Sequence, residues 1–395
     1  MIARNRAENN LFSASGDSFH RVSYSQNIGA ARLLNQFGQS IDEWINPEAF
    51  SINNQVVGSK LSRDREMAYR AFDDFLAQSG GDFPASLVFG TISNLSIRRK
   101  LALYNNMDYP TGPPWANGNI LFELKDVFDG LIAQLKTPTL KPRLAYYHLW
   151  APHSPYRPIA KFADTFIDNW KPVVKPQHRF GPQISNSNLR TRRSHYDEYV
   201  ANVDDEFGRM LEVMENDGLL ENNYIVVTSD HGEMFERGVD GHTTPLLYDP
   251  VVHSPLIISS PGQTSRVDIK TPTNSIDVLP TLLHLAGQKI PDWCEGQVLP
   301  GLGRADNPER ATFIVEAKSN PAFSPLTEAT IAMRKGQYKL IYYTGYETED
   351  SFELYDHEND LEELNDLYPQ QPAIAKSLRA ELLDKLSEAN SGLKR

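Results

Sequence analysis

The distribution of hydrophobic and polar positions predicts that helices and strands alternate along most of the chain. Apolar residues recur at a helical period in four stretches, which predicts amphipathic helices at 30–37, 62–77, 120–135 and 196–216. Short apolar or aromatic runs predict strands at 19–25, 83–94, 144–150, 224–228 and 255–259. A short link joins the helix that ends near residue 216 to the strand at 224–228, so we expect a parallel sheet there. The pattern as a whole predicts an α/β fold.

The pattern changes near the C-terminus. A last helix of the α/β type is predicted at 275–286. From about residue 311 onward, short strands and turns follow one another and a helix closes the chain, with strands at 312–316, 328–334, 338–343 and 352–355 and the helix at 371–386. Consecutive short strands of this kind are typical of an antiparallel sheet. We therefore predict an α/β domain at residues 1–308 and a small α+β subdomain at residues 309–395.

Composition narrows the classes of partner. The chain has 395 residues with 39 Lys plus Arg and 51 Asp plus Glu, a net charge of −12. This charge argues against nonspecific nucleic-acid binding, because phosphates would be repelled, but it leaves a small anionic ligand open. The single cysteine, Cys294, excludes an intrachain disulfide. No apolar run approaches the roughly 18 residues of a membrane span, and the start lacks the apolar region of a signal peptide, so the expected location is cytoplasmic.

Candidate chemistry lies where two predicted strands end. The strand at 224–228 runs into Ser229-Asp230-His231-Gly232. In open α/β sheets, ligands bind at the carboxyl ends of strands. A carboxylate and an imidazole at such an end can bind a divalent metal ion or transfer a proton. The alternative is a helix N-cap Asp beside a surface His. The strand at 144–150 likewise ends in a proline-rich loop that carries His153.

Several motifs in this order resemble the sulfatases of the alkaline-phosphatase superfamily, which also contains the phosphonate monoester hydrolases. The motifs lie at 228–234, 241–242, 247–249, 254–258, 261–262, 277–283, 338–341 and 353–360. The resemblance runs from about residue 140 to the end and is weaker before that point. It implies a mostly parallel sheet sandwiched by helices, with a small antiparallel C-terminal subdomain. It also implies metal-dependent hydrolysis of a sulfate or phosphate ester.

The resemblance assigns roles to four residues. Asp230 and His231 would be metal ligands, and His153 would contact the ester or its leaving group. His242 stands where many sulfatases have a lysine that binds the sulfate. The alternatives are a loop histidine stacked on Trp150 or Tyr156 for His153, and an ordinary loop histidine for His242. The implied cofactor is a divalent ion, calcium or manganese, and the implied substrate is a small anionic ester, with no nucleic acid and no membrane span.

One part of the family pattern is missing from the sequence. We find neither the two acidic ligands after a first strand nor the Cys-or-Ser-x-Pro-x-Arg stretch that carries the nucleophile; Cys294 and the Asp73-Asp74 pair lie in other contexts. We expect that the chain starts about a hundred residues late, which would leave the metal weakly held. The sequence therefore predicts a sulfatase-like hydrolase of sulfate or phosphate/phosphonate esters that is inactive as this chain alone. The alternative is a non-catalytic remnant or a binding protein with the same fold.

Overall fold

A computed structural model describes residues 9–52, 108–116, 120–167, 172–321 and 324–392. The chain divides into two compact units. The N-terminal unit comprises Asp17–Asn169 and Thr191–Leu220; the C-terminal unit comprises Met1–Gly16, Trp170–Arg190 and Glu221–Arg395. The helix predicted at 62–77, which includes Asp73-Asp74, and the strand predicted at 83–94 lie outside the described residues.

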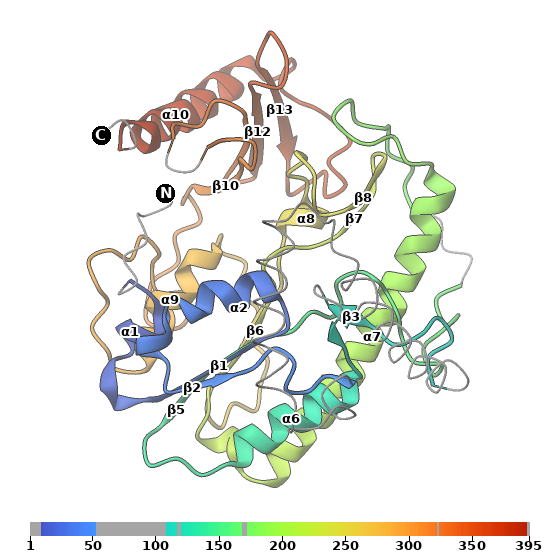
Figure 1. The fold of residues 1–395 in the computed structure, drawn as a ribbon. Helices are drawn as coiled ribbons and strands as arrows, with labels where there is room; N and C mark the ends of the chain where they lie inside the picture. The colour runs from blue at the N-terminus through green and yellow to red at the C-terminus, as the bar shows by residue number, and fades with distance from the viewer. Residues whose placement is uncertain (1–8, 53–107, 117–119, 168–171, 322–323, 393–395) are drawn as a thin grey trace, which may run out of the picture. The chain divides into compact units, whose positions relative to one another are not determined.

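The N-terminal unit contains a parallel sheet, as the α/β pattern predicts. β1 (His20–Ser25) is the middle strand and pairs in parallel with β2 (Glu43–Ile45) and β5 (Arg143–His148). Helix α2 (Ile28–Asn35) connects β1 to β2, and α6 (Leu124–Lys136) precedes β5. Figure 1 shows α2 and α6 on opposite sides of this sheet. Right-handed crossovers that run in opposite directions along a sheet place their helices this way.

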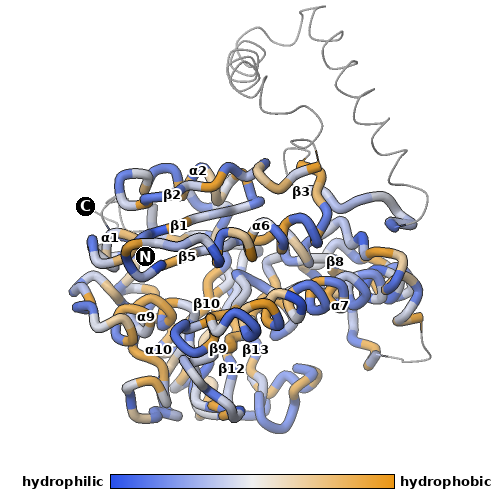
Figure 2. The backbone as a smooth tube through the Cα atoms, turned by 90° about the horizontal axis from the view of Figure 1, so that it is seen from below, coloured by the Kyte–Doolittle hydropathy of each residue, from blue (hydrophilic) through white to orange (hydrophobic). Residues whose placement is uncertain are grey.

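The two long helices of this unit differ from their predicted bounds at the N-terminal end. α6 begins at Leu124 because Ile120–Leu121 forms β4, which pairs with β3 (Trp115–Ala116). α7 (Asn186–Asn216) begins earlier than the predicted 196, and its residues from 191 onward belong to this unit. Figure 2 shows hydrophobic and hydrophilic positions alternating along both helices, as expected for helices with one face against a core. The prediction of these two helices is therefore confirmed, and only their N-terminal bounds differ from the predicted ones.

In the C-terminal unit, the strand that leads to Asp230 has an antiparallel partner. β6 (Ile225–Thr228) pairs with β9 (Leu256–Ser259), and the register joins Ile225 to Ser259. The sequence predicts a parallel neighbour for β6, and this prediction is wrong for its described partner β9. The reason is the intervening chain: a hairpin of β7 (Met234–Glu236) and β8 (Val239–Gly241), followed by helix α8 (Asp249–Val252), returns the chain in the opposite direction.

The antiparallel sheet predicted near the C-terminus is confirmed. Its strands are β10 (Thr312–Glu316), β11 (Ala329–Lys335), β12 (Tyr338–Thr344) and β13 (Ser351–Asp356), in this spatial order. Alternate residues point to opposite faces. One face, with Ile331 and Leu340, packs against Leu378 and Leu382 of helix α10 (Pro372–Ser391), which lies along the sheet in Figure 1.

The opposite face of this sheet packs onto the segment that carries the candidate site. Ala332 and Ile341 share a buried cluster with Met234, Leu247 and Val251. The compact C-terminal unit thus contains residues from both sides of position 308, and the domain division there stays a prediction. The remaining elements are α1 (Leu11–Ala14), η1 (Gly16–Ser18), η2 (Gly38–Ser40), η3 (Leu219–Glu221), η4 (Ser275–Asp277) and α9 (Val278–Leu285). None of the described helices combines the length and apolar character that crossing a bilayer requires.

Candidate active site

Asp230 and His231 lie directly after β6, as predicted. The His231 backbone N–H donates to Asp230 Oδ1 at 3.1 Å. The His231 ring nitrogen Nδ1 lies 2.9 Å from the Gly232 carbonyl oxygen, and His231 Nε2 lies 3.7 Å from Asp230 Oδ1. Because a carbonyl oxygen only accepts hydrogen bonds, this contact places the proton on Nδ1 of the neutral ring. The lone pair then resides on Nε2, on the side of the Asp230 carboxylate.

The β7–β8 hairpin brings His242 to the same place. Its two-residue turn consists of Arg237 and Gly238, with φ angles of 55° and 81°, the backbone signs of a type I′ turn. The register pairs Met234 with Gly241, so Glu233 and His242 lie opposite each other immediately outside the pairing. His242 Nδ1 lies 2.6 Å from Glu233 Oε1.

Two histidines of the candidate site are in direct contact. The His231 and His242 rings stack with centroids 3.7 Å apart and planes 20° from parallel. The Glu233 side chain is only 6% exposed, whereas that of Asp230 is 66% exposed. A carboxylate as buried as Glu233 needs a partner, and His242 supplies it. The site therefore combines a Glu233 carboxylate that is largely shielded from solvent, its partly exposed partner His242, and a solvent-accessible Asp230.

Gly232 explains how the turn after β6 packs so closely. Its N–H donates to the Val251 carbonyl at 2.8 Å. A Cβ at this position would lie 2.1 Å from the Pro250 carbonyl oxygen. Only glycine allows this approach, so the Asp230-His231-Gly232 sequence is fixed against helix α8 by backbone geometry as well as by side chains.

The donor set fits part of the shell of a divalent metal ion. Histidines that bind metals almost always donate their other ring N–H to a carbonyl or carboxylate, and both His231 and His242 have such a contact. Oxygen and nitrogen ligands lie about 2.0–2.2 Å from an ion such as zinc, so two ligands of one ion are separated by about 3–4 Å. The 3.7 Å between Asp230 Oδ1 and His231 Nε2 matches that separation.

His153 belongs to the N-terminal unit, in the loop after β5. Its backbone N–H donates to the Trp150 carbonyl at 2.9 Å, and Trp150 Nε1–H donates to the Ser154 carbonyl at 3.0 Å. The His153 ring contacts the Trp150 ring, with centroids 4.3 Å apart. Local hydrogen bonds thus hold the loop around His153, and the stacking on Trp150 named above as an alternative is present. Such stacking is compatible with either interpretation, so a site role for His153 stays a prediction.

Two arginines of α7 and the single cysteine have local surroundings of their own. Arg193 lies 3.7 Å from Asp197 one turn along α7, and the Arg192 guanidinium lies 5.9 Å from the centre of the Tyr156 ring. Burial raises the pKa of the Cys294 thiol, which keeps it protonated and unreactive near neutral pH. The sequence analysis missed the partnership of Glu233 with His242. The available signal was Gly238 between Met234-Phe235 and Val239, since a glycine between short segments favours a tight turn.

Comparison with known proteins agrees with this geometry. The sequence model described as Sulfatase matches residues 96–288, and the model described as N-sulphoglucosamine sulphohydrolase, C-terminal, matches residues 242–391. The chain is 30% identical over 217 residues to an ulvan-active sulfatase of Formosa agariphila, covering 53% of this chain and 40% of that protein. It is 27% identical over 254 residues to a choline-sulfatase of Rhizobium meliloti, covering 58% and 47%. The chain thus spans less than half the length of these two relatives.

Solved structures show the same fold. A phosphonate monoester hydrolase from Silicibacter pomeroyi superposes with a TM-score of 0.62 at 20% identity, covering 96% of this chain and 80% of that one. The enzyme of the same name from Agrobacterium radiobacter superposes with a TM-score of 0.56 at 20% identity, covering 68% and 62%. The fold is therefore that of the alkaline-phosphatase superfamily. With the two sequence models matching in order along the chain, the protein belongs to the sulfatase family.

Proposed function

We propose that this chain carries part of the site of a metal-dependent hydrolase that acts on small sulfate or phosphate/phosphonate esters. The observation that carries the proposal is the convergence of Asp230, His231 and His242 at the end of β6, with a ligand-like separation between the first two. The relatives act in the same chemical class by name: one is a choline-sulfatase and one is an ulvan-active sulfatase.

Each residue has a distinct role in the proposal. Asp230 and His231 hold the divalent ion, whose charge would stabilise the ester oxygens and the attacking nucleophile. A mixed carboxylate and imidazole pair suits manganese better than calcium, which binds oxygen ligands. His242 keeps its Nδ1–H bond to Glu233 and, when doubly protonated, donates Nε2–H to an ester oxygen. His153 contacts the ester or its leaving group.

We also infer that this chain by itself lacks groups that the hydrolysis needs. Its 395 residues contain no Cys-or-Ser-x-Pro-x-Arg stretch to supply the nucleophile. Asp230 and His231 are also only two ligands, whereas an ion such as calcium takes six or more. We infer that the chain binds the ion and the ester weakly and does not turn the ester over by itself.

Metal-dependent binding of an ester tests the proposed function. We expect phenyl phosphate or phenyl sulfate to bind more tightly with manganese than with a chelator, measured by calorimetry. His242→Ala should weaken ester binding more than manganese binding, because the proposal assigns His242 to the ester and assigns Asp230 and His231 to the ion. His253→Ala is the matched control, since the His253 side chain is 71% exposed. Equal ester binding with manganese and with chelator would refute the proposal.

A further inference from the structure

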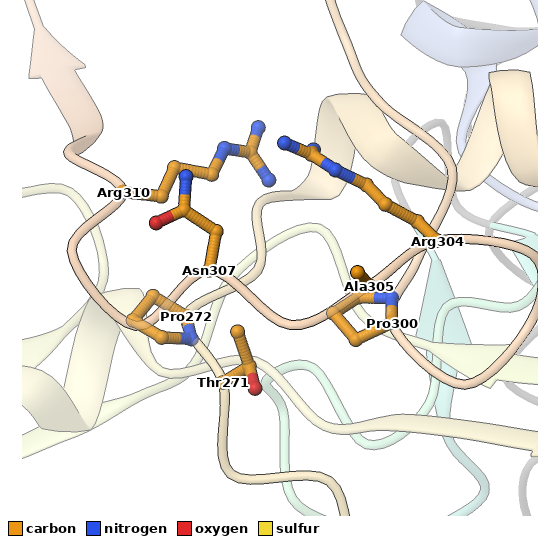
Figure 3. Close-up of a pocket in the computed structure, with 7 residues that line it drawn as sticks. All are labelled: Thr271, Pro272, Pro300, Arg304, Ala305, Asn307 and Arg310. Atoms are coloured by element: carbon orange, nitrogen blue, oxygen red, sulfur yellow. The ribbon is translucent and has the colours of Figure 1, made fainter.

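A second cluster of cationic side chains lies in the C-terminal unit, apart from the residues of the candidate active site. Figure 3 shows the guanidinium groups of Arg304 and Arg310 pointing toward one another. The Asn307 side chain lies beside the Arg310 side chain in this view. The lining also includes Thr271, Pro272, Pro300 and Ala305. We call these seven residues the arginine pocket. Its cavity volume is about 10 Å³, roughly the space for one water molecule, so a ligand would lie at the open mouth of the pocket and contact the arginines from there.

Arg310 is held firmly on one side of the pocket. Its Nη1 and Nη2 atoms donate to Asp277 Oδ2 and Oδ1 at 2.5 and 2.8 Å. Asp277 is fully buried and also accepts hydrogen bonds from the backbone N–H groups of Gln297 and Asn274. This carboxylate orients Arg310 and balances one positive charge. The charge of the second arginine needs another partner.

Arg304 has no such carboxylate. Within the described part of the chain, no acidic oxygen comes within 4.0 Å of its guanidinium nitrogens. The backbone of Arg304 is held by a β-bridge to Pro300. This bridge closes a turn that contains Gly301 and Gly303. Gly303 has a φ of 129°, and a Cβ there would lie 2.4 Å from His284 Nε2. The turn that presents Arg304 is therefore specified by close packing on α9.

Two guanidinium groups that face each other repel unless an anion lies between them. Asp277 balances the positive charge of Arg310, so one positive charge of the pocket remains uncompensated. Guanidinium forks match the paired oxygens of sulfate and phosphate, and the Asn307 amide offers a further donor. We propose that the arginine pocket is a binding site for a tetrahedral oxyanion, either free sulfate or phosphate or the same group carried by a larger anionic molecule. This inference does not depend on the proposed function of the metal site.

The test is a titration of the purified chain with sodium sulfate in the presence of a chelator, with sodium chloride held at matched ionic strength. We expect saturable binding, and Arg304→Gln should raise the dissociation constant about tenfold, as expected for the loss of a charge-assisted pair. Arg266→Gln is the matched control, because Arg266 is exposed and already pairs with Asp268 at 2.8 Å. A parallel titration with a sulfated disaccharide identifies the source: the ligand that binds more tightly is the natural form of the group.

Two outcomes would overturn the proposal. One is the absence of sulfate binding beyond the effect of chloride, and the other is equal loss of affinity in Arg304→Gln and Arg266→Gln. The Tm of Arg304→Gln without sulfate should equal that of the unmodified chain, since no ion pair is lost, and this checks that the variant is folded. Asp230→Ala should retain full sulfate binding under chelation. A failure of the metal site therefore leaves this result unchanged, and the two proposals can fail separately.

Discussion

At the scale of single residues, the chemistry of the site depends on which nitrogen of each histidine carries its proton. The Gly232 carbonyl fixes the tautomer of His231, and the Glu233 carboxylate fixes that of His242. The backbone turn and the hairpin thus decide how the imidazoles are presented, which is the usual function of groups just behind a metal ligand.

The first prediction concerns Asp230. Asp230→Ala should weaken manganese binding by at least about tenfold, because it removes one of the two proposed metal ligands. The measurement is a titration of free Mn²⁺ by electron paramagnetic resonance. Asp268→Ala, which removes an exposed carboxylate elsewhere in the same unit, should leave the affinity unchanged. If both variants bind manganese equally, Asp230 is not a ligand.

The second prediction concerns Glu233. Glu233→Ala should convert His242 from a ring protonated at Nδ1 to a mixture of the two neutral tautomers, because the acceptor at 2.6 Å is lost. Nitrogen-15 chemical shifts of the imidazole report the tautomer directly. Glu233→Gln should retain the original tautomer, because its amide oxygen still accepts the hydrogen bond. An unchanged spectrum in Glu233→Ala would show that Glu233 does not position His242.

At the scale of elements, the close contact between the Gly232 turn and α8 sets the geometry after β6. Gly232→Ala should destabilise the chain by about 1–3 kcal/mol, because the new methyl group would overlap the Pro250 carbonyl. Gly208→Ala is the matched control: Gly208 lies within α7 and has open space around its Cβ position, so alanine should stabilise the helix by up to about 1 kcal/mol. Urea unfolding measures both. A stable Gly232→Ala would mean that the turn moves freely.

The Asp277–Arg310 ion pair predicts a pH dependence of stability at the start of α9. Burial opposes ionisation of Asp277, but hydrogen bonds from Arg310 and from the Gln297 and Asn274 N–H groups outweigh it and lower the pKa of the carboxyl. A folded-state pKa below the unfolded value of about 3.9 contributes stability above that pH, and this contribution is lost as the pH falls toward the folded pKa.

Asp277→Asn checks this sign. At pH 7 the variant should be less stable by about 3–5 kcal/mol, because Arg310 loses a buried partner. The difference between the variant and the unmodified chain should shrink as the pH falls below about 4. Free energies of unfolding from denaturant titrations between pH 7 and pH 3 provide the measurement. A difference that does not vary with pH would exclude ionised Asp277 as the source.

At the scale of the whole molecule, the chain has the fold of a sulfatase, and its sequence contains no Cys-or-Ser-x-Pro-x-Arg stretch. We therefore expect hydrolysis of 4-nitrophenyl sulfate and 4-nitrophenyl phosphate by this chain to stay near background with manganese or calcium, because no nucleophile motif is present in its 395 residues. The assay is release of nitrophenol. Robust turnover that Asp230→Ala abolishes would show that a nucleophile lies within the chain after all.

The sequence by itself determined the α/β class, the C-terminal antiparallel sheet and the ligand candidates Asp230 and His231. These features depend on local periodicity and on a compact motif at a strand end, which neighbouring residues encode. Only the tertiary structure decided the antiparallel pairing of β6 with β9, the stacking of His231 on His242 and the buried Glu233. The physical reason is that these contacts arise from the register of a hairpin and the return path of the chain. Such contacts join residues whose sequence spacing carries no periodic signal.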